Sequence, residues 1–366
     1  MRLLPRLLWT ILFVMLSLRL SAEEPTVKPL KDLFPQFYIG TCLGGLLPDD
    51  FTNEEMALID AHFNVVTPEG CMKPEPIQPE EGVFHFKYPD DLVAYAEAHG
   101  KRVTGHTLIW HQQCPDWFFL DGNKPASREL VLRRLRTHIN TLVGRYRGQI
   151  MGWDVVNEAI DDGKDVYYRP TKWWKAIGDD YIEKAFEYAH EADPDAELYY
   201  NDYSIESPVK REKTLKLIAR LKEKGLRIDA VGIQGHWELD KVPFKDIEDA
   251  IVAFHNAGVK VMITELDLDV VTRWTPKDAP KEVANPYPNA CPPEVLQRQA
   301  EQYAKLFEIF ARHSDKITRV AFWGLHDGRS WLNFWPRWRM NYPLLFDRNA
   351  KPKPAFYAVQ KVGLTP

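Results

Sequence analysis

The chain has 366 residues, of which 12% are aromatic and 27% charged, and its formal net charge is -5. This negative balance, with no basic stripe to offset it, argues against nucleic acid as a partner. The four cysteines are widely spaced and form no C-x-x-C pair, which argues against a zinc ribbon or a redox motif. The length after the first 22 residues suits one large α/β domain with long loops.

The first 22 residues have the pattern of a secretory signal. Two arginines precede an apolar run at residues 7–18, and small residues come before the acidic Glu23. The apolar run is too short for a stable membrane span, although a membrane-anchored N-terminus is the alternative. We therefore expect a secreted protein, extracellular or periplasmic, with a signal at 1–22, an N-terminal segment at 23–32 and one folded domain at 33–366. No membrane contact is expected after removal of the signal.

Short apolar segments alternate with amphipathic helical segments from about residue 37 onward. That alternation is typical of a parallel sheet covered by helices. The predicted strands are 38–41, 64–67, 103–106, 151–157, 198–201, 230–234, 259–265 and 320–323. Eight parallel strands are the number that closes the commonest barrel of this class, so we predict a single (β/α)8 TIM barrel with extended βα loops.

Four helices are predicted from their apolar spacing and their ends. One runs from residue 91 to a stop at Gly100, and another begins at Ser127. The segments 208–224 and 243–256 each have proline near the start and glycine just past the end, the asymmetry that helices prefer. Residues 280–293 are rich in proline and asparagine and are predicted to be a long surface loop.

The cysteines give no pairing. Export would permit disulfides. Cys42, Cys71 and Cys114 each follow a predicted strand and could lie near one another, but their connectivity and that of Cys291 stay open.

Two glutamates stand at predicted strand ends, Glu158 after an apolar strand and Glu265 at the end of another. In a barrel of parallel strands these ends share one rim, where chemistry is built. Two carboxyl groups facing one cleft are what glycosidic-bond hydrolysis requires. Other polar or aromatic residues at strand ends are Glu69, Lys73, His106, Trp110, His111, Asn157, Asn201, Tyr203, Gln234, His236, Asp267 and Trp323.

Four motifs resemble those of family 10 glycoside hydrolases, the barrel endo-β-1,4-xylanases. They lie in family order at 105–111, 153–158, 264–267 and 343–347, so the resemblance covers the chain from about Leu33 to its end. It implies a catalytic domain at 33–366 that acts as a retaining endo-1,4-β-xylanase. Glu158 would be the general acid/base and Glu265 the nucleophile of a double displacement through a covalent glycosyl-enzyme.

The resemblance also assigns the residues around the two glutamates. Asn157 matches the residue that bonds the sugar 2-hydroxyl, and His236 and Asp267 match the pair that orients the nucleophile. The other implied substrate-binding residues are Glu69, Lys73, His106, Trp110, Gln113, Tyr203, Gln234, His236, Trp323 and Trp331. Xylan or xylo-oligosaccharides are the implied partners of a monomer, and neither a metal nor a cofactor is implied.

The chain departs from the family motif after the second strand. The family commonly has Glu-Asn-Glu-Met-Lys-Trp, whereas this chain has Glu69-Gly70-Cys71-Met72-Lys73-Pro74. The usual asparagine bonds the sugar one unit beyond the cleaved residue on the non-reducing side. Gly70 would remove that hydrogen bond and open space, so we predict weaker binding there and greater tolerance of arabinose or glucuronate branches.

Several alternatives stay open. A β-1,4-glucanase could use the same scaffold, and a non-catalytic xylan-binding barrel is disfavoured because both glutamates are present. A metal-dependent hydrolase would use three histidines with Asp267 and leave the glutamates without a role. We expect His111 to be structural, and Trp117, Trp153 and Trp174 to lie in the core. The residues that could either extend the cleft or pack loops are Trp237, Trp335 and Trp338.

Overall fold

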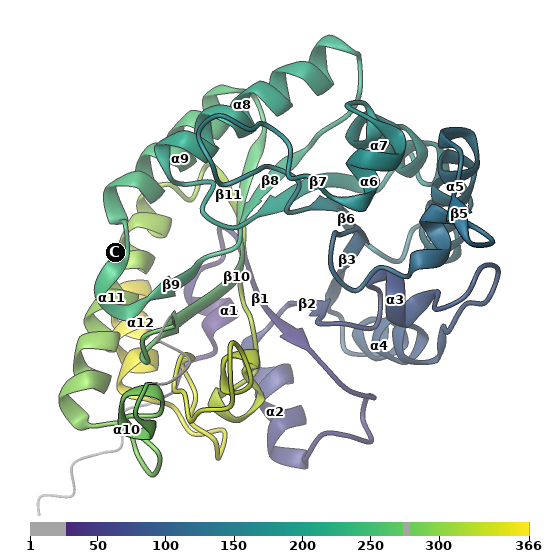
Figure 1. Ribbon diagram of the computed structural model, residues 1–366. Helices are drawn as coiled ribbons and strands as arrows, with labels where there is room; N and C mark the ends of the chain where they lie inside the picture. The colour runs from purple at the N-terminus through teal and green to yellow at the C-terminus, as the bar shows by residue number, and fades with distance from the viewer. Residues whose placement is uncertain (1–26, 274–278, 366) are drawn as a thin grey trace, which may run out of the picture.

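The computed structural model describes residues 27–273 and 279–365. Within these residues, eight parallel strands form one closed sheet (Figure 1), because β11 pairs with β1 on one side and with β10 on the other. The strands are β1 (Tyr38–Leu43), β2 (Val65–Pro68), β3 (Arg102–Ile109), β6 (Gly152–Asn157), β7 (Glu197–Asp202), β8 (Ala230–Ile233), β10 (Lys260–Asp269) and β11 (Ile317–Phe322). The predicted (β/α)8 barrel is confirmed, and each predicted strand is present with ends that differ by a few residues.

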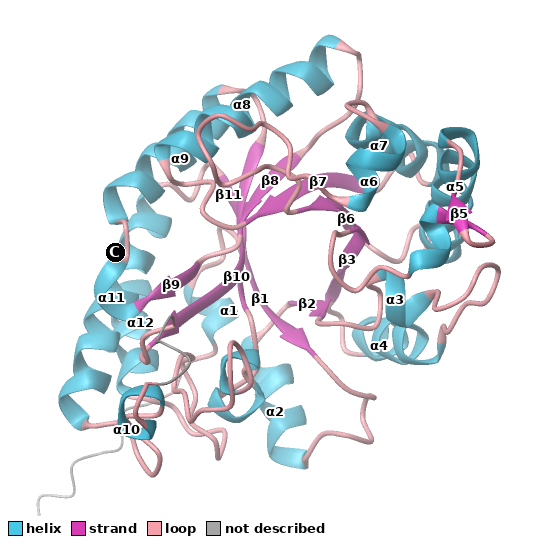
Figure 2. Cartoon of the chain, in the orientation of Figure 1, coloured by secondary structure: helices cyan, strands magenta, loops and turns pink. Residues whose placement is uncertain are grey.

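Helices surround the barrel and cover the outer faces of its strands (Figure 2). They are α2 (Asn53–His62), α4 (Lys87–Ala98), α5 (Arg128–Arg145), α7 (Tyr181–Ala192), α8 (Pro208–Glu223), α9 (Phe244–Asn256), α11 (Pro293–Arg312) and α12 (Pro354–Leu364). The four predicted helices are confirmed. Ser127 caps α5 by accepting a hydrogen bond from the Leu130 N–H, as its position predicted. α4 begins at Lys87, earlier than predicted.

Short elements decorate the loops between strands and helices. They are α1 (Leu30–Leu33), α3 (Pro74–Ile77), α6 (Lys172–Ile177), α10 (Lys281–Ala284), β4 (Leu120–Asp121), β5 (Lys124–Pro125), β9 (His236–Glu238) and the 3-10 turns Asp116–Phe119, Leu239–Lys241, Asp327–Arg329 and Trp331–Asn333. The prediction of a loop at 280–293 is therefore wrong for residues 281–284, which form α10. There the carbonyl of Pro280 accepts the Ala284 N–H and closes a single helical turn.

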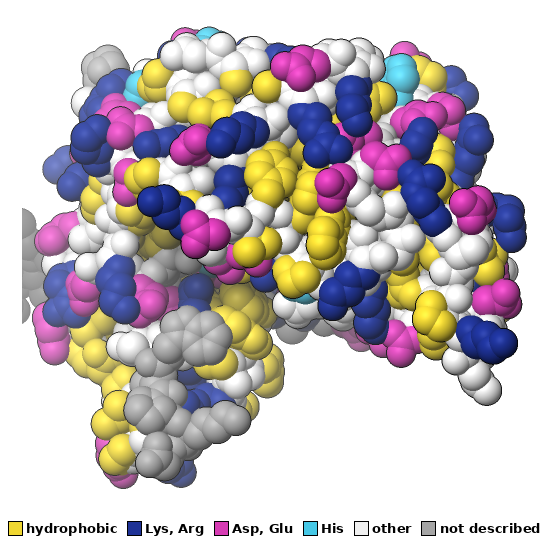
Figure 3. All heavy atoms as spheres, turned by 45° about the horizontal axis from the view of Figure 1, so that its top comes forward, with side chains coloured by type: hydrophobic (Ala, Val, Ile, Leu, Met, Phe, Trp, Pro, Cys, Tyr) yellow, Lys and Arg dark blue, Asp and Glu magenta, His cyan; other side chains and the backbone are white. Residues whose placement is uncertain are grey.

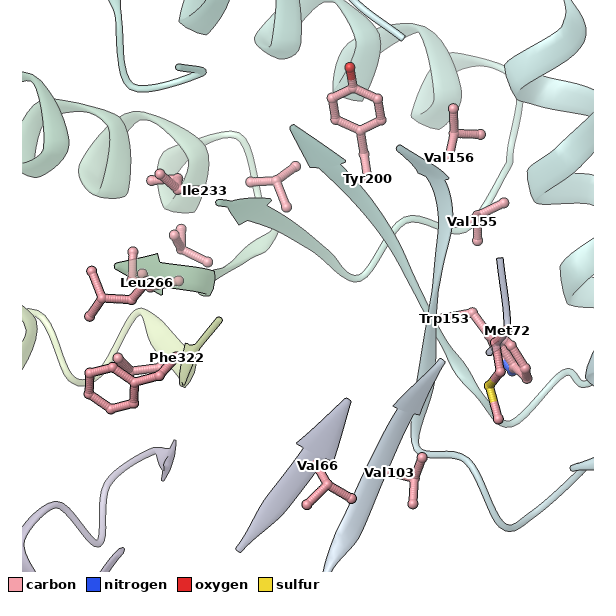
Figure 4. Close-up of a cluster of buried hydrophobic side chains, with 14 of the residues drawn as sticks. Val66, Met72, Val103, Trp153, Val155, Val156, Tyr200, Ile233, Leu266 and Phe322 are labelled. Atoms are coloured by element: carbon pink, nitrogen blue, oxygen red, sulfur yellow. The ribbon is translucent and has the colours of Figure 1, made fainter. Parts of the chain in front are cut away.

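The strands are apolar on both faces because side chains fill the barrel and helices cover it. All six residues of β6 are buried, and Trp153 within it is fully buried as predicted. Trp117 and Trp174 are half-buried against the same core. Part of this packing is shown in Figure 4, with labelled side chains from seven strands: Val66, Val103, Trp153, Val155, Val156, Tyr200, Ile233, Leu266 and Phe322.

The two ends of the described chain meet beside α12. The Lys28 N–H donates to Gln360 Oε1 at 2.7 Å, and Leu30 is fully buried. α1 spans the predicted domain boundary at residue 33 and leads directly into β1. The junction therefore lies at the end of the barrel where the strands begin. The predicted signal at 1–22 lies outside the described residues.

Within the described ranges, none of the helices combines the length and apolar composition that crossing a bilayer requires. On the face shown in Figure 3, basic and acidic side chains are interspersed. All four cysteines are among the described residues and carry free thiols. The expectation that Cys42 follows a strand is wrong, because β1 stays paired with β2 as far as Leu43 and so contains it.

Candidate active site

Glu158 stands directly after β6, at a sharp turn in the backbone. Its φ of 57° is in the left-handed region, which a residue with a side chain adopts only when its surroundings hold it there. The Glu158 N–H donates to the Asn201 carbonyl at 2.9 Å, and the Glu158 carbonyl accepts from Arg169 Nε at 3.0 Å. The turn is thus fixed on both sides, and it presents the carboxyl group at the rim.

Tyr200 holds the next two residues of this turn. Its hydroxyl accepts the N–H groups of Ala159 and Ile160 at 3.2 and 3.1 Å. The same hydroxyl donates to Asp202 Oδ2 at 2.6 Å, and Lys210 Nζ donates to Asp202 Oδ1 at 2.8 Å. Burial raises the pKa of Asp202, and Lys210 opposes that rise. These supports come from β7 and α8, and sequence reasoning did not identify them.

Both carboxyl oxygens of Glu158 accept hydrogen bonds from neutral donors. Trp110 Nε1 donates to Oε2 at 2.9 Å and Gln234 Nε2 donates to Oε1 at 3.1 Å. His111 Nδ1 lies 3.8 Å from Oε2 and has no hydrogen-bond partner in the described part of the chain. Burial lowers the pKa of His111 to about 4. His111, expected to be structural, therefore lies as a neutral ring beside Glu158.

Glu265 lies within β10 and is 5% exposed. Its Oε1 accepts from Asn201 Nδ2 at 2.7 Å, and its Oε2 accepts from His236 Nε2 at 3.0 Å. Burial raises the pKa of Glu265, but the hydrogen bond from His236 and nearby positive charge outweigh burial. The net pKa lies below the usual range of a glutamate, so Glu265 is ionised at neutral pH.

His236 is held between two carboxylates because β9 pairs in parallel with the end of β10, which places His236 opposite Asp267. Its Nδ1 donates to Asp267 Oδ2 at 2.9 Å, and Trp331 Nε1 donates to the same oxygen at 2.9 Å. Burial lowers the pKa of His236, but the charges of Asp267 and Glu265 outweigh it and raise the pKa to about 9. His236 is thus an imidazolium at neutral pH, and both of its nitrogens donate.

Side-chain amides connect the two glutamates. Asn157 Oδ1 accepts from Asn201 Nδ2 at 3.0 Å and from Gln234 Nε2 at 3.2 Å. Since Asn201 also donates to Glu265 and Gln234 to Glu158, a continuous chain of hydrogen bonds joins the carboxylates. Among the described residues none accepts from Asn157 Nδ2. This donor is available for a sugar hydroxyl, the role that the resemblance assigns to Asn157.

Asn201 is the central member of this chain, and the sequence noted it only as a polar strand end. Thr264 Oγ1 donates to Asn201 Oδ1 at 2.6 Å and fixes the orientation of the amide. A Cβ added at Gly232 would lie 2.3 Å from that oxygen and 2.7 Å from Thr264 Cγ2. Gly232 therefore makes the room that Asn201 needs. The signal in the sequence was the asparagine at the end of strand 198–201 followed by a glycine in the next strand.

The predicted residues after β2 and β3 line one side of the cleft. Glu69, Lys73 and Gln113 border a hollow of about 760 Å³ that reaches to Tyr88. Lys73 Nζ lies 4.7 Å from the centre of the Trp110 ring. Burial raises the pKa of Glu69, and the charge of Lys73 opposes that rise. A Cβ added at Gly70 would meet nothing within 4 Å, so there is open space at the position of the family asparagine.

His106, Trp323 and Trp331 lie near Glu265 and its partner His236. His106 Nδ1 donates to Asp154 Oδ2 at 2.8 Å, and the His106 ring lies 5.1 Å from the Trp323 ring. The His236 ring lies 6.4 Å from Trp323 and 5.0 Å from Trp331. These aromatic rings gather around the Glu265 side of the cleft, where the resemblance places a sugar.

Tyr203 follows β7, and its hydroxyl is already used within the protein. It donates to Asp162 Oδ2 at 2.6 Å and accepts from Arg169 Nη2 at 2.5 Å. Lys210 Nζ lies 3.9 Å from the centre of its ring. Arg169 and Lys210, which sequence reasoning missed, thus tie Tyr203 to the turn of Glu158. Trp237, one of the tryptophans left open, is buried and donates to Glu206 Oε1 at 2.8 Å, so it packs a loop.

The three histidines of the metal-dependent alternative do not converge. His106 bonds Asp154, His236 bridges two carboxylates, and His111 faces Glu158. Across residues 27–273 and 279–365, no group of three or more His, Cys, Asp or Glu side chains has an arrangement that could hold a metal ion. The arrangement of these side chains therefore fits a site built on two carboxylates and their hydrogen-bond donors.

Comparison with known proteins agrees with this geometry. The family model of glycosyl hydrolase family 10 matches residues 30–362. A β-1,4-xylanase of Dictyoglomus thermophilum is 40% identical over 346 residues, which are 94% of this chain and 94% of that protein. A solved GH10 endoxylanase from a sugarcane soil metagenome matches with a TM-score of 0.87 and 40% identity, covering 92% of this chain and 100% of that chain. A solved mutant in complex with xylotriose matches with a TM-score of 0.84 and 39% identity, covering 92% and 99%. The chain therefore belongs to glycosyl hydrolase family 10, as its four motifs predicted.

Proposed function

We propose that this protein is a retaining endo-1,4-β-xylanase that cleaves internal bonds of xylan. One observation carries the proposal: Glu158 and Glu265 are joined by the amides of Asn157, Asn201 and Gln234, and only Glu265 is bonded to a cation. A retaining glycosidase needs such a pair, one carboxyl group to deliver a proton and one carboxylate to attack. Retention requires them to be about 5 to 5.5 Å apart.

In the first step, a Glu265 oxygen attacks the anomeric carbon while Glu158 delivers its proton to the glycosidic oxygen. The carbon–oxygen bond to the leaving sugar breaks, and a glycosyl ester with Glu265 forms. His236 and Asn201 keep the carboxylate ionised and aimed before attack. The Nδ2 donor of Asn157 bonds the sugar 2-hydroxyl, a contact that strengthens as the ring flattens.

In the second step, Glu158 removes a proton from water, and the water oxygen attacks the same carbon from the face that the leaving sugar vacated. The ester bond breaks and Glu265 leaves as a carboxylate, so the product keeps the β configuration. Two inversions at one carbon account for retention.

Xylan is the proposed substrate because the relatives carry that activity in their names and a neighbouring structure holds xylotriose. A β-1,4-glucanase is the alternative, since glucose differs from xylose by a hydroxymethyl group. The pattern of residues 1–22 supports export as part of the proposal, and we take the enzyme to act as a monomer.

The decisive experiment compares reducing-sugar release from xylan with release from carboxymethylcellulose. We expect activity on xylan that survives a chelator, with the β anomer seen first by proton NMR. Glu158→Gln and Glu265→Gln should each abolish release from xylan. Stronger activity on carboxymethylcellulose would support the glucanase, and xylan binding without any release would support the non-catalytic barrel.

A further inference from the structure

Three large aromatic side chains are exposed in the five-residue stretch 334–338, which lies between β11 and α12. Phe334 is 68% exposed, Trp335 37% and Trp338 62%. Of the tryptophans that the structure describes, only Trp335 and Trp338 are exposed to this degree. In Figure 1 this segment belongs to the yellow-green loops between α2 and α10. Clustered aromatic exposure on a soluble protein marks a binding surface more often than chance, because it otherwise costs solubility.

We call residues 333–339 the aromatic loop. Its two ends, Asn333 and Arg339, are firmly held. The Arg339 N–H donates to the Asn333 carbonyl at 2.8 Å and closes the loop. Arg339 Nη2 donates to Asp269 Oδ2 at 2.6 Å, and both residues are almost completely buried. Arg348 Nη2 donates to Asn333 Oδ1 at 2.7 Å. The exposed rings therefore stand on a rigid support, which lowers the entropy cost of binding.

The aromatic loop is continuous with the cleft. The Trp335 ring stacks on the Trp331 ring, with centroids 4.9 Å apart and planes 28° apart. Trp331 in turn bonds Asp267 and lies 5.0 Å from the His236 ring. The guanidinium of Arg273 lies within 6.0 Å of both stacked rings. A sugar chain that leaves the cleft over Trp331 would meet Trp335 next.

We propose that the aromatic loop is an additional binding platform for the polysaccharide, outside the sugars that flank the cleaved bond. This inference rests on the proposed function. The flat rings of Phe334 and Trp338 offer apolar faces to the C–H faces of β-1,4-linked pyranoses. A second copy of the chain is the alternative occupant, and the oligomeric state of the wild type and the double variant distinguishes it.

The test uses the full-length enzyme with Trp338→Ala and the double variant Phe334→Ala/Trp338→Ala. The readout is the ratio of kcat/KM on soluble xylan to kcat/KM on an aryl β-xylobioside, which is too short to reach beyond the cleft. We expect this ratio to fall about tenfold in the double variant, through KM for xylan, since each stacking contact contributes about a factor of three to ten. Trp338→Phe, which keeps a flat ring, should restore most of the ratio.

Val209→Ala, which removes an exposed apolar side chain from α8, is the matched control and should leave the ratio unchanged. An equal loss on both substrates, or an unchanged ratio, would overturn the platform. So would a wild-type dimer that the double variant converts to a monomer, which would make the loop an interface between copies. If the wild type releases nothing from xylan, the proposed function fails instead, and the two failures are thereby distinguished.

Discussion

The two glutamates of the cleft differ in the charge of their hydrogen-bond donors. Glu265 accepts from the His236 imidazolium, whereas Glu158 accepts from the neutral Trp110 indole and Gln234 amide. His111, the other neighbour of Glu158, is also neutral because burial lowers its pKa to about 4. A cationic donor stabilises a carboxylate more than a neutral donor does. These side chains thus support the proposed roles, with Glu265 as the attacking anion and Glu158 as the proton carrier.

His236→Asn tests this assignment. The variant removes the cation that lowers the pKa of Glu265, so that pKa should rise. The proposed mechanism requires ionised Glu265, and the acidic limb of the kcat/KM profile should therefore move to higher pH. We also expect kcat to fall about 10- to 100-fold, since Glu265 loses a charged hydrogen bond of about 1.5 to 3 kcal/mol. A lower rate with an unmoved acidic limb would contradict the electrostatic role of His236.

Gly70→Asn tests the departure of this chain from its family. Nothing lies within 4 Å of a Cβ at this position, so the new side chain has room and the fold should be unaffected. We expect tighter binding of unbranched xylo-oligosaccharides, about fivefold to tenfold for one added hydrogen bond, and a lower rate on arabinose- or glucuronate-branched ones. Gly70→Ala is the control, since it fills space without adding a donor. Unchanged affinity and branch preference in Gly70→Asn would contradict the prediction.

Among the secondary-structure elements, β7 does the most to position Glu158. Its Tyr200 side chain bonds two N–H groups of the loop after β6, and its Asn201 carbonyl bonds a third. Asn201 also reaches Glu265 on β10 through its side chain. β7, which lies between β6 and β10 in the sheet, therefore supports both glutamates. A small displacement of β7 would disturb Glu158 and Glu265 together.

Tyr200→Phe should separate positioning from stability. It leaves the N–H groups of Ala159 and Ile160 and the Asp202 carboxylate without their shared partner, so kcat should fall about tenfold with KM little changed. The adjacent Tyr199→Phe is the matched control, because Tyr199 is equally buried and its hydroxyl bonds Glu197, away from the glutamates of the cleft. Both variants should lose about 1 to 3 kcal/mol of unfolding free energy. Similar kcat values for the two variants would contradict the positioning role of Tyr200.

The elements that the sequence predicted are those with a local cause. The apolar segments 151–157 and 259–265 became β6 and β10, and glycine and proline marked helix ends correctly. β10 continues to Asp269, beyond its predicted end, because β9 pairs with it and Leu268 bonds the Pro343 carbonyl. β9 is too short to show periodicity, and Pro343 is distant from β10 in the sequence. The one-turn α10 was missed for the same reason of length.

The residues of the site were predictable where a motif carried them. Glu158, Glu265 and Asp267 were named from their motifs, and His236 from its strand end and its match to a family position. Hydrogen bonds connect all four of them, Glu158 through side-chain amides. Tyr200 and Arg169 were not, because each acts through backbone groups of a loop whose path only the fold determines. His111 looked redundant beside His106 in the sequence. In the structure, His111 follows β3 and faces Glu158.

For the molecule as a whole, the buried His236 couples stability to pH. The pKa of His236 is about 9 in the folded state, whereas an ordinary histidine, as in the unfolded chain, has a pKa of 6.5. The folded state therefore binds the proton more tightly. The resulting contribution, up to about 3 kcal/mol, is complete below pH 6.5 and is lost as pH rises through about 9. Denaturant unfolding across this range should show the decline. His236→Asn should show less of it, and an equal decline in both proteins would assign it elsewhere.

The hydrogen bond between Lys28 and Gln360 shows that the two ends of the barrel domain lie next to each other. Circular permutation should therefore be possible, with a short linker across the native ends and new ends opened at Gly122, in the exposed turn between β4 and β5. Because the native junction lies where the strands begin, a cargo or anchoring module fused there would project from the side opposite the glutamates. Such a fusion should digest polymer at the rate of the unfused enzyme.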